Sequence, residues 1–383
     1  MKKFPLVVAS GLLAAAMLSF AACSPAASDG PDPDVSDGEL APVTLQLKWL
    51  RQSQFMGYYA ADVLGFYEEE GLDVTIVEGG STSEIDAVES GNAQFGTTWV
   101  SNLLPSIANG SSLMAIAQFY QDSGMTIVSM KETQGEETAV EAGESVGNWL
   151  GGNQYELQAY LASLGLDTQL TSQSYDMNQL LTGELHWASA MTYNELGLVL
   201  EEGYDLDDLN VIYMRDTDVA MMEDCLFVDS EWAAANQDTV RAFLRASIKG
   251  WAWACTHADP AEMGVAGNDT GALVYEAGDS VSLYHQQYMA SEVAKLVVDG
   301  TTVTESDLNA IGTMVESEFE TTRDILSQYY TSSTASTTPS STDLATQEAI
   351  GNLTFSQVFY TAFWEEVHDA VDLSDLDSYV FSS

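Results

Sequence analysis

Aromatic and amide side chains recur where predicted strands of this chain run into predicted helices. Flat aromatic faces stack on planar rings, and amides both donate and accept hydrogen bonds, so together they suit a planar heterocycle with a patterned edge. In the first half of the chain the set is Trp49, Gln52, Gln54, Trp99, Asn102, Gln118, Phe119, Tyr120 and Gln121. In the second half it is Trp149, Asn153, Gln154, Tyr155, Tyr175, Asp176, Met177, Asn178, Thr192, Tyr193, Asn194 and Glu195. Capping or packing explains any single member, but recurrence in both halves predicts a binding site.

Strands that alternate with helices must position these residues. Alternating apolar residues predict a strand at 43–49, and helical spacing of apolar residues predicts a helix at 54–70. Further strands are predicted at 73–77, 93–97 and 113–119, with helices at 84–90 and 101–109. This order predicts an α/β fold with a parallel-rich sheet and helices on both faces. Such sheets bind ligands beyond the carboxyl ends of their strands.

The same alternation of predicted strands and helices follows a polar stretch at 131–143. Strands are predicted at 145–150, 167–173, 188–191 and 209–214, and helices at 154–164, 176–181, 192–203 and 229–258. A low-complexity loop is expected at 331–342.

Catalytic and metal-binding motifs are missing from the sequence. It contains no GxSxG elbow, no Walker loop, no HExxH and no GxGxxG. Acidic pairs such as Glu201–Glu202 are expected on the solvated surface, and the four histidines are scattered without zinc-ligand spacing. We therefore predict that the protein is not an enzyme and carries neither cofactor nor metal.

The charge balance excludes one class of partner. The 383 residues include 11 Lys and Arg against 58 Asp and Glu, a formal net charge of −47. A chain this acidic repels phosphate backbones, so nucleic-acid binding is excluded. We expect the charge to serve solubility.

The N-terminus predicts export and a lipid anchor. Lys2 and Lys3 precede a mostly apolar run that ends in small residues before Cys23, which resembles a bacterial lipoprotein signal. We expect a signal peptide at 1–22, lipidation of Cys23 and a flexible tether at 23–42, which place the body outside the cytoplasm on the cell membrane. An ordinary signal peptide is the alternative. Outside the cytoplasm Cys225 and Cys255 could form a disulfide, and two buried thiols are the other interpretation.

Several stretches resemble a known family. The run LQLKWLRQSQFMGYYAADVLGFYEEEGLDVTIVEGG (Leu45 to Gly80) is similar to the opening of extracytoplasmic solute-binding proteins of ABC importers, in the thiamine-pyrimidine-synthase/sulfonate-binding-like (SsuA/THI5-like, NMT1) subgroup. The similarity continues at 174–197, 219–232 and 240–254, and MTYNELG is its most specific part. It covers roughly residues 43 to 260.

The resemblance implies a two-lobed periplasmic-binding-protein fold of type II that closes about a hinge. Lobe one is expected at 43–130 plus 225–383, lobe two at 131–224, and the hinge segments near 129–143 and 215–226. It also implies an ABC permease as partner, and a pyrimidine precursor of thiamine or riboflavin as the small heterocyclic solute. The candidate ligand-binding residues are Trp49, Gln54, Tyr58, Tyr59, Trp99, Gln118, Trp149, Gln154, Tyr155, Asn178, Tyr193, Asn194 and Glu195.

Glu195, with Asn194, is the best candidate for recognising the edge of a ring. A carboxylate accepts from the exocyclic amine and the protonated ring nitrogen of an aminopyrimidine. The imide edge of a flavin would favour an amide such as Asn178, Gln118 or Gln154. The alternative for Glu195 is an acid at a helix N-terminus, favoured by the helix dipole.

Two other classes compete with a vitamin-precursor receptor. A receptor for sulfonates or nitrate needs positive charge, and Lys48, Arg51 and Arg215 are the cations nearest the motifs. A pyrimidine-synthesising enzyme like the fungal members would need their cysteine-rich stretch. Near that place this chain has Cys225 alone.

Overall fold

The computed structural model describes residues 40–167, 169–259, 268–278, 281–298, 303–333 and 339–381. The expected signal peptide and Cys23 lie outside these residues. Strand β1 begins at Ala41, so the last two residues of the expected tether belong to the folded body.

The first sheet has five strands within the described residues, in the order β2 (Leu72–Val77), β1 (Ala41–Gln46), β3 (Phe95–Trp99), β10 (Asp224–Asp229) and β4 (Leu113–Gln118). β2, β1 and β3 pair in parallel, and β10 is antiparallel to both β3 and β4. β4 therefore runs in the same direction as β3, and the sheet is parallel-rich, as predicted.

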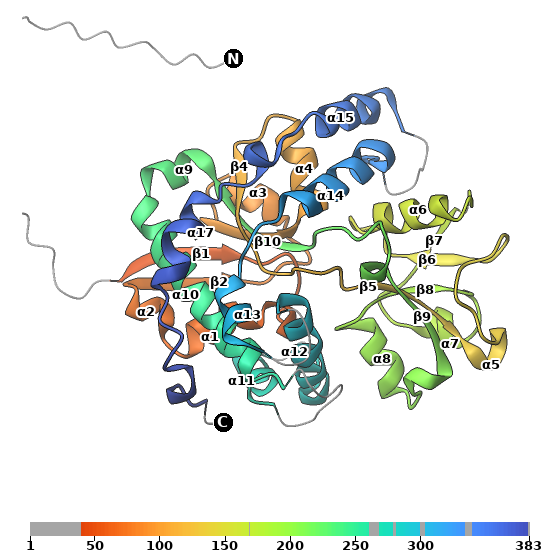
Figure 1. The fold of residues 1–383 in the computed structure, drawn as a ribbon, viewed down its shortest axis with the longest axis horizontal. Coiled ribbons are helices and arrows are strands. Elements are labelled where there is room, and N and C mark those ends of the chain that lie inside the picture. The colour runs from red at the N-terminus through yellow and green to blue at the C-terminus, as the bar shows by residue number, and fades with distance from the viewer. Residues whose placement is uncertain are drawn as a thin grey trace, which may run out of the picture. The chain divides into compact units, whose positions relative to one another are not determined.

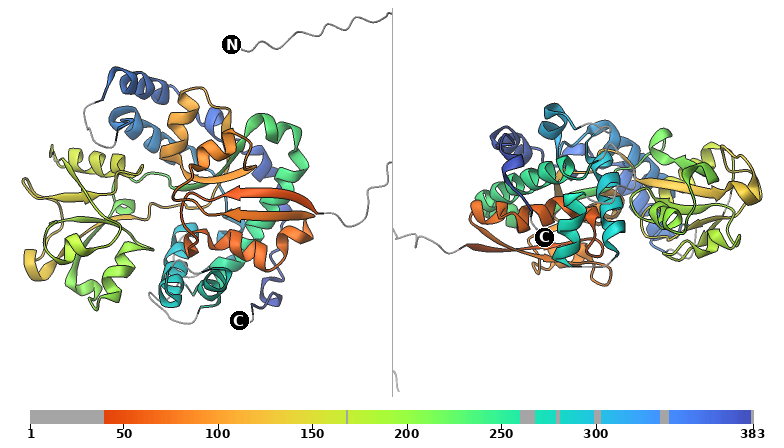
Figure 2. Two further views of the ribbon diagram at one scale, coloured as in Figure 1. Left: turned by 180° about the vertical axis from the view of Figure 1, so that it is seen from behind. Right: turned by 90° about the horizontal axis from the view of Figure 1, so that it is seen from below.

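The second sheet repeats this order. β5 (Met125–Met130) pairs antiparallel with β8 (Ala188–Met191) and β9 (Leu209–Tyr213), and β6 (Val146–Asn148) pairs in parallel with β7 (Leu170–Ser172). A parallel bridge from Val146 to Trp187 joins these two groups. The resulting order β7–β6–β8–β5–β9 matches that of the first sheet, with one antiparallel strand inserted among parallel ones. Figures 1 and 2 show both groups of strands.

The two sheets define two lobes, and the chain passes between them at 119–124 and at 217–223. Two expectations need correction. β5 lies in the second sheet, so residues 125–130 belong to lobe two and not to lobe one. The segment 129–143, expected as a hinge, lies wholly in lobe two, whereas the expected segment 215–226 does contain the return connection.

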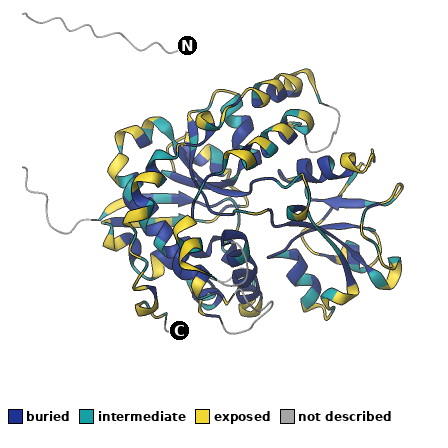
Figure 3. Ribbon diagram, in the orientation of Figure 1, coloured by how far each residue is buried: buried dark blue, intermediate teal, exposed yellow. Residues whose placement is uncertain are grey.

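Helices cover both faces of the first sheet. Along β10, Leu226 and Val228 join the core cluster formed with α1 and α10, whereas Cys225 and Phe227 join the cluster formed with α3 and α4. This alternation is the two-residue period of a strand buried on both sides. Figure 3 shows the buried strands. The helices of lobe one are α1 (Met56–Val63), α2 (Phe66–Glu69), α3 (Glu84–Glu89), α4 (Val100–Ala108), α9 (Ser230–Ala235), α10 (Gln237–Thr256), α11 (Asp269–Ala277), α12 (Leu283–Val297), α13 (Glu305–Ala310), α14 (Glu316–Tyr329), α15 (Ser341–Gly351), α16 (Phe355–Val358) and α17 (Ala362–Val367). Those of lobe two are α5 (Lys131–Gln134), α6 (Gln154–Ser163), α7 (Asn178–Leu181) and α8 (Glu195–Glu201).

Two helices predicted as continuous are broken. The predicted helix at 54–70 divides at Gly65, which has a φ of +81°, and the one at 229–258 divides at Asn236. The predicted loop at 331–342 ends where α15 begins at Ser341.

Cys225 and Cys255 are both buried free thiols, so the disulfide alternative is wrong. Among the described residues, every helix is too short or too polar to span a membrane.

Helices from the C-terminal part of lobe one contact lobe two. On α12, His285 Nε2 lies 2.9 Å from Asn194 Oδ1, and the hydroxyl of Tyr288 donates to the carbonyl of Thr192 at 2.7 Å. Beyond α14, the carbonyl of Thr331 accepts from the hydroxyl of Tyr155 on α6 at 3.0 Å. These contacts join the lobes at places other than the connecting segments.

Candidate functional site

A cavity lies between the two lobes, where strands of both sheets end. Its volume is about 560 Å³, which includes the open space at its mouth. Its lining residues from lobe one are Lys48, Trp49, Gln54 and Trp99; those from lobe two are Trp149, Gly151, Asn153, Tyr175, Met191, Tyr193, Asn194 and Glu195. Each lobe thus supplies part of the wall.

The structure brings about half of the predicted site residues to this cavity. They are Trp49, Gln54, Trp99, Trp149, Tyr193, Asn194 and Glu195. Asn153 and Tyr175, from the wider set of aromatic and amide residues, line it too. Gly151 and Met191 were missed, because neither residue type carries a signal for binding. Lys48 was considered only as a charge near the motifs.

Aromatic rings form a wall that spans the two lobes. Trp49 of lobe one lies 5.1 Å, between ring centroids, from Tyr175 of lobe two, with a tilt of 46°. Tyr175 is in turn stacked on Trp149 at 6.3 Å and 9°. Flat faces from both lobes are therefore available to a planar ligand.

Glu195 begins α8 and presents a buried carboxylate to the cavity. Its Oε2 accepts from the backbone N–H of Met191 at 3.0 Å, and its Oε1 accepts from Asn194 Nδ2 at 2.8 Å. Its side chain is 3% exposed, and burial raises its pKa to about 7. Each carboxylate oxygen can accept a second hydrogen bond, so Glu195 retains capacity for donors on a ligand.

Asp224, the first residue of β10, lies directly behind two lining side chains. Its Oδ2 accepts from Gln54 Nε2 at 3.0 Å and from the indole N–H of Trp99 at 2.9 Å. Burial raises its pKa to about 6, and the hydrogen bonds oppose this rise. Its Oδ1 is buried without a partner among the described residues. Sequence reasoning missed Asp224, since one acid among fifty-eight carries no local signal.

The cavity has one unpaired buried acceptor and one cation among its described lining residues. The buried Oδ1 of Asn153 has no hydrogen-bond partner among the described residues. Lys48 is the one cation among the described lining residues, and its ammonium lies 4.5 Å from the ring centroid of Trp99 and 3.9 Å from Glu84 Oε1. Its charge is therefore already offset by a carboxylate.

Three predicted residues of lobe one do not line the cavity. Tyr58 packs edge-on against Phe119 and Trp251 with centroids 5.6 Å apart, and Tyr59 lies buried beside Arg51. Gln118 is fully buried, and its Nε2 donates to backbone carbonyls, including that of Tyr120 at 2.9 Å. Their roles are packing and the satisfaction of backbone groups.

Three predicted residues of lobe two also lie elsewhere. Gln154 accepts from the backbone N–H of Gly152 through its own Oε1 at 2.7 Å. Tyr155 faces lobe one through its hydrogen bond to Thr331. Asn178 is exposed at the start of α7. The three amides that we expected at a flavin edge therefore do not line the cavity, whereas Gln54, Asn153 and Asn194 do.

Comparison with solved structures identifies the class of fold. A ligand-binding component of an ABC-type import system from Staphylococcus aureus, with zinc bound, aligns with a TM-score of 0.57 and 12% identity over 85% of this chain and 99% of its own. The periplasmic sulfonate-binding protein described as SsuA from Methylobacillus flagellatus KT gives 0.58 and 13% over 88% and 96%. The periplasmic nitrate-binding protein NrtA from Synechocystis PCC 6803 gives 0.55 and 12% over 90% and 92%. The fold is thus the α/β periplasmic-binding-protein fold, with mixed sheets and helices, as predicted.

The family follows from the sequence. The NMT1/THI5-like family model matches residues 52–262, which is more than half of the chain, so the chain belongs to the NMT1/THI5-like family. This confirms the resemblance drawn from the motifs. No curated protein matches the chain.

Proposed function

We propose that this protein is the solute-binding component of an ABC importer, held to the membrane by a lipid on Cys23, and that it captures a pyrimidine precursor of thiamine. The family and the fold support the receptor role. Closure of the lobes around the solute would create the form that the permease recognises.

The observation that carries the choice of solute is the buried carboxylate of Glu195 beside aromatic rings. An aminopyrimidine of the hydroxymethylpyrimidine or formylaminopyrimidine type offers a flat ring and amine donors, which match stacking faces and acceptors. A sulfonate or nitrate would instead meet a carboxylate and a lysine already offset by Glu84. A flavin would lack the edge amides Asn178, Gln118 and Gln154 that we expected for it.

The test measures binding of both aminopyrimidines, riboflavin, thiamine, taurine and nitrate to the purified protein by thermal shift and calorimetry. We expect the aminopyrimidines to raise the melting temperature, because a ligand that binds only the native state stabilises it. Glu195→Gln should lower their affinity by about 10- to 100-fold, since hydrogen bonds to a charged group contribute about 1.5–3 kcal/mol. Glu202→Gln, an exposed acid at the end of the same helix, is the matched control and should bind as the parent does.

Two results would contradict the proposal. Stabilisation by taurine or nitrate alone would assign an anion receptor, and the aromatic residues would then serve as core and rim. Unchanged aminopyrimidine affinity in Glu195→Gln would remove Glu195 from the site.

A further inference from the structure

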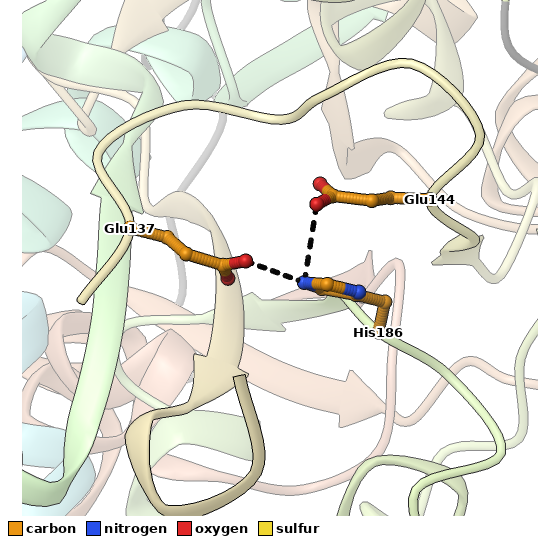
Figure 4. Close-up of side chains that lie close together, drawn as sticks. All are labelled: Glu137, Glu144 and His186. Atoms are coloured by element: carbon orange, nitrogen blue, oxygen red, sulfur yellow. Dashed lines mark hydrogen bonds and ion pairs between the residues drawn. The ribbon is translucent and has the colours of Figure 1, made fainter. Parts of the chain in front are cut away.

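A histidine and two glutamates meet in lobe two, outside the lining of the cavity (Figure 4). Glu137 and Glu144 lie in the loop between α5 and β6, and His186 lies just before β8. His186 Nε2 is 2.8 Å from Glu137 Oε1 and 3.5 Å from Glu144 Oε1. The three ligand atoms all lie within 4.8 Å of one another. Two segments far apart in sequence thus direct one imidazole nitrogen and two carboxylate oxygens to one point.

The outer oxygen of each carboxylate is held in place. Glu137 Oε2 accepts from the hydroxyl of Ser129 at 2.8 Å. Glu144 Oε2 accepts from the indole N–H of Trp187 at 2.9 Å and from the backbone N–H of Glu141 at 2.8 Å. Such outer hydrogen bonds orient the ligands of metal sites. They leave the Oε1 atoms directed at His186.

The imidazole forms a hydrogen bond with only one of the two inner oxygens, Glu137 Oε1. The imidazole Nε2 has one proton or one lone pair, so it satisfies one carboxylate at most. Among the described residues Glu144 Oε1 accepts no hydrogen bond, and no lysine or arginine forms an ion pair with either glutamate. The side chains of Glu137, Glu144 and His186 are 16%, 15% and 19% exposed, so water screens this charge only in part.

We propose that Glu137, Glu144 and His186 bind one divalent transition-metal ion of the Zn²⁺ type. Imidazole nitrogen and carboxylate oxygen ligate Zn²⁺ at about 2.0–2.2 Å, and imidazole favours such ions over Ca²⁺ and Mg²⁺. The ion accepts the Nε2 lone pair of neutral His186, so any proton on Nε2 moves to Nδ1 or to solvent. Water fills the remaining positions on the exposed side.

The ion would tie the loop before β6 to the start of β8. β6 leads directly to Trp149, which lines the cavity, so this link would fix the segment that supplies one aromatic face. The proposal does not depend on which solute the cavity binds.

The test titrates Zn²⁺, and separately Mn²⁺, into the chelator-treated, tag-free protein by calorimetry with excess Mg²⁺ present to occupy weak surface sites. We expect one saturable Zn²⁺ site. Affinity should fall at least about tenfold in Glu137→Gln, Glu144→Gln and His186→Gln, because each variant removes a ligand. Glu136→Gln removes the same charge at the adjacent, exposed position and should keep the site.

Crystals of the parent protein grown with Zn²⁺ give a readout that does not depend on the folding of variants. An anomalous peak bounded by the three side chains is expected. Absence of a saturable site, equal loss in Glu136→Gln, or an anomalous peak elsewhere would each overturn the proposal.

Discussion

A single buried carboxylate orients two of the side chains that line the cavity. Asp224 accepts from both Gln54 and Trp99, yet is not itself a lining residue. Its ionised form is costly in the folded state, as the pKa of about 6 indicates. Asp224 is therefore a positioning residue that serves binding more than stability.

The substitution Asp224→Asn distinguishes a role of Asp224 in solute binding from a role in stability. Asparagine keeps one acceptor oxygen, so one of the two donors loses its partner, at a cost of about 1–3 kcal/mol. At pH 8 the loss of a buried charge offsets this cost, because each unit of pKa displacement is worth about 1.4 kcal/mol. We expect solute affinity to fall roughly tenfold with little change in melting temperature, measured by calorimetry and thermal unfolding. Exposed Asp218 provides the control variant, Asp218→Asn; equal affinity in the two variants would contradict the role of Asp224.

Individual residues show how far the site could be predicted. Trp49, Trp99 and Trp149 lie at or just after strand ends, where the carboxyl ends of parallel strands converge, and they do line the cavity. Tyr58 and Tyr155 lie further along the chain within helices, where each residue turns the side chain by about 100°, and they face the core or the other lobe. Residue type and order along the chain do not specify that rotation, because packing sets it.

At the scale of elements, the turn after β6 brings lobe two close to α4 of lobe one. Gly152 has a φ of +118°, and a Cβ built there would lie 2.5 Å from the side-chain oxygen of Asn102 on α4. Glycine permits both the positive φ and the close approach of lobe one.

Gly152→Ala should therefore lower stability by about 1–3 kcal/mol through backbone strain and also weaken solute binding by separating the lobes. Adding Asn102→Ala removes the clash and leaves the strain, so it should restore part of the affinity but not the stability. Calorimetry and chemical unfolding measure the two quantities. Gly151→Ala is the control for stability, since a Cβ there has open space; equal destabilisation by both alanines would refute the argument.

The two strands that sequence reasoning missed, β5 and β10, share one property. Every residue of β5 is buried, and β10 is buried except at its last residue, so neither strand shows the alternation of polar and apolar residues that marks a half-exposed strand. The βαβ rhythm predicted that the sheet would be mainly parallel. The two antiparallel insertions were not predictable, because they pair with strands that lie far away in the sequence.

At the scale of the whole molecule, buried acids govern the response to pH. Burial raises the pKa of Glu156 to about 8 and that of Glu195 to about 7, and it raises the pKa of Glu223 well above its ordinary value, with Glu156 adding to the rise. The folded state thus binds protons more tightly than the unfolded state. This contribution to stability is complete below the unfolded pKa near 4.5 and is lost as pH rises through the folded values.

We therefore expect the free energy of unfolding to increase as pH falls from about 8 to about 5. Glu156→Gln should raise the free energy of unfolding at pH 8. It should also reduce the slope of that free energy against pH by up to about 1.4 kcal/mol per pH unit, which corresponds to one bound proton. Chemical unfolding at several pH values measures this slope. Exposed Glu348→Gln should leave the slope intact; a parent protein whose stability rises with pH over this range would refute the prediction.

The position of β10 along the chain also constrains the order in which the two lobes can fold. β10 lies between β3 and β4, although both of those strands precede the whole of lobe two along the chain. A chain that emerges from its N-terminus exposes the inner edges of β3 and β4 until residue 229 has been released. Unpaired strand edges recruit other chains, and long loops close slowly. The sheet of lobe one therefore cannot be completed before all residues of lobe two have been synthesised.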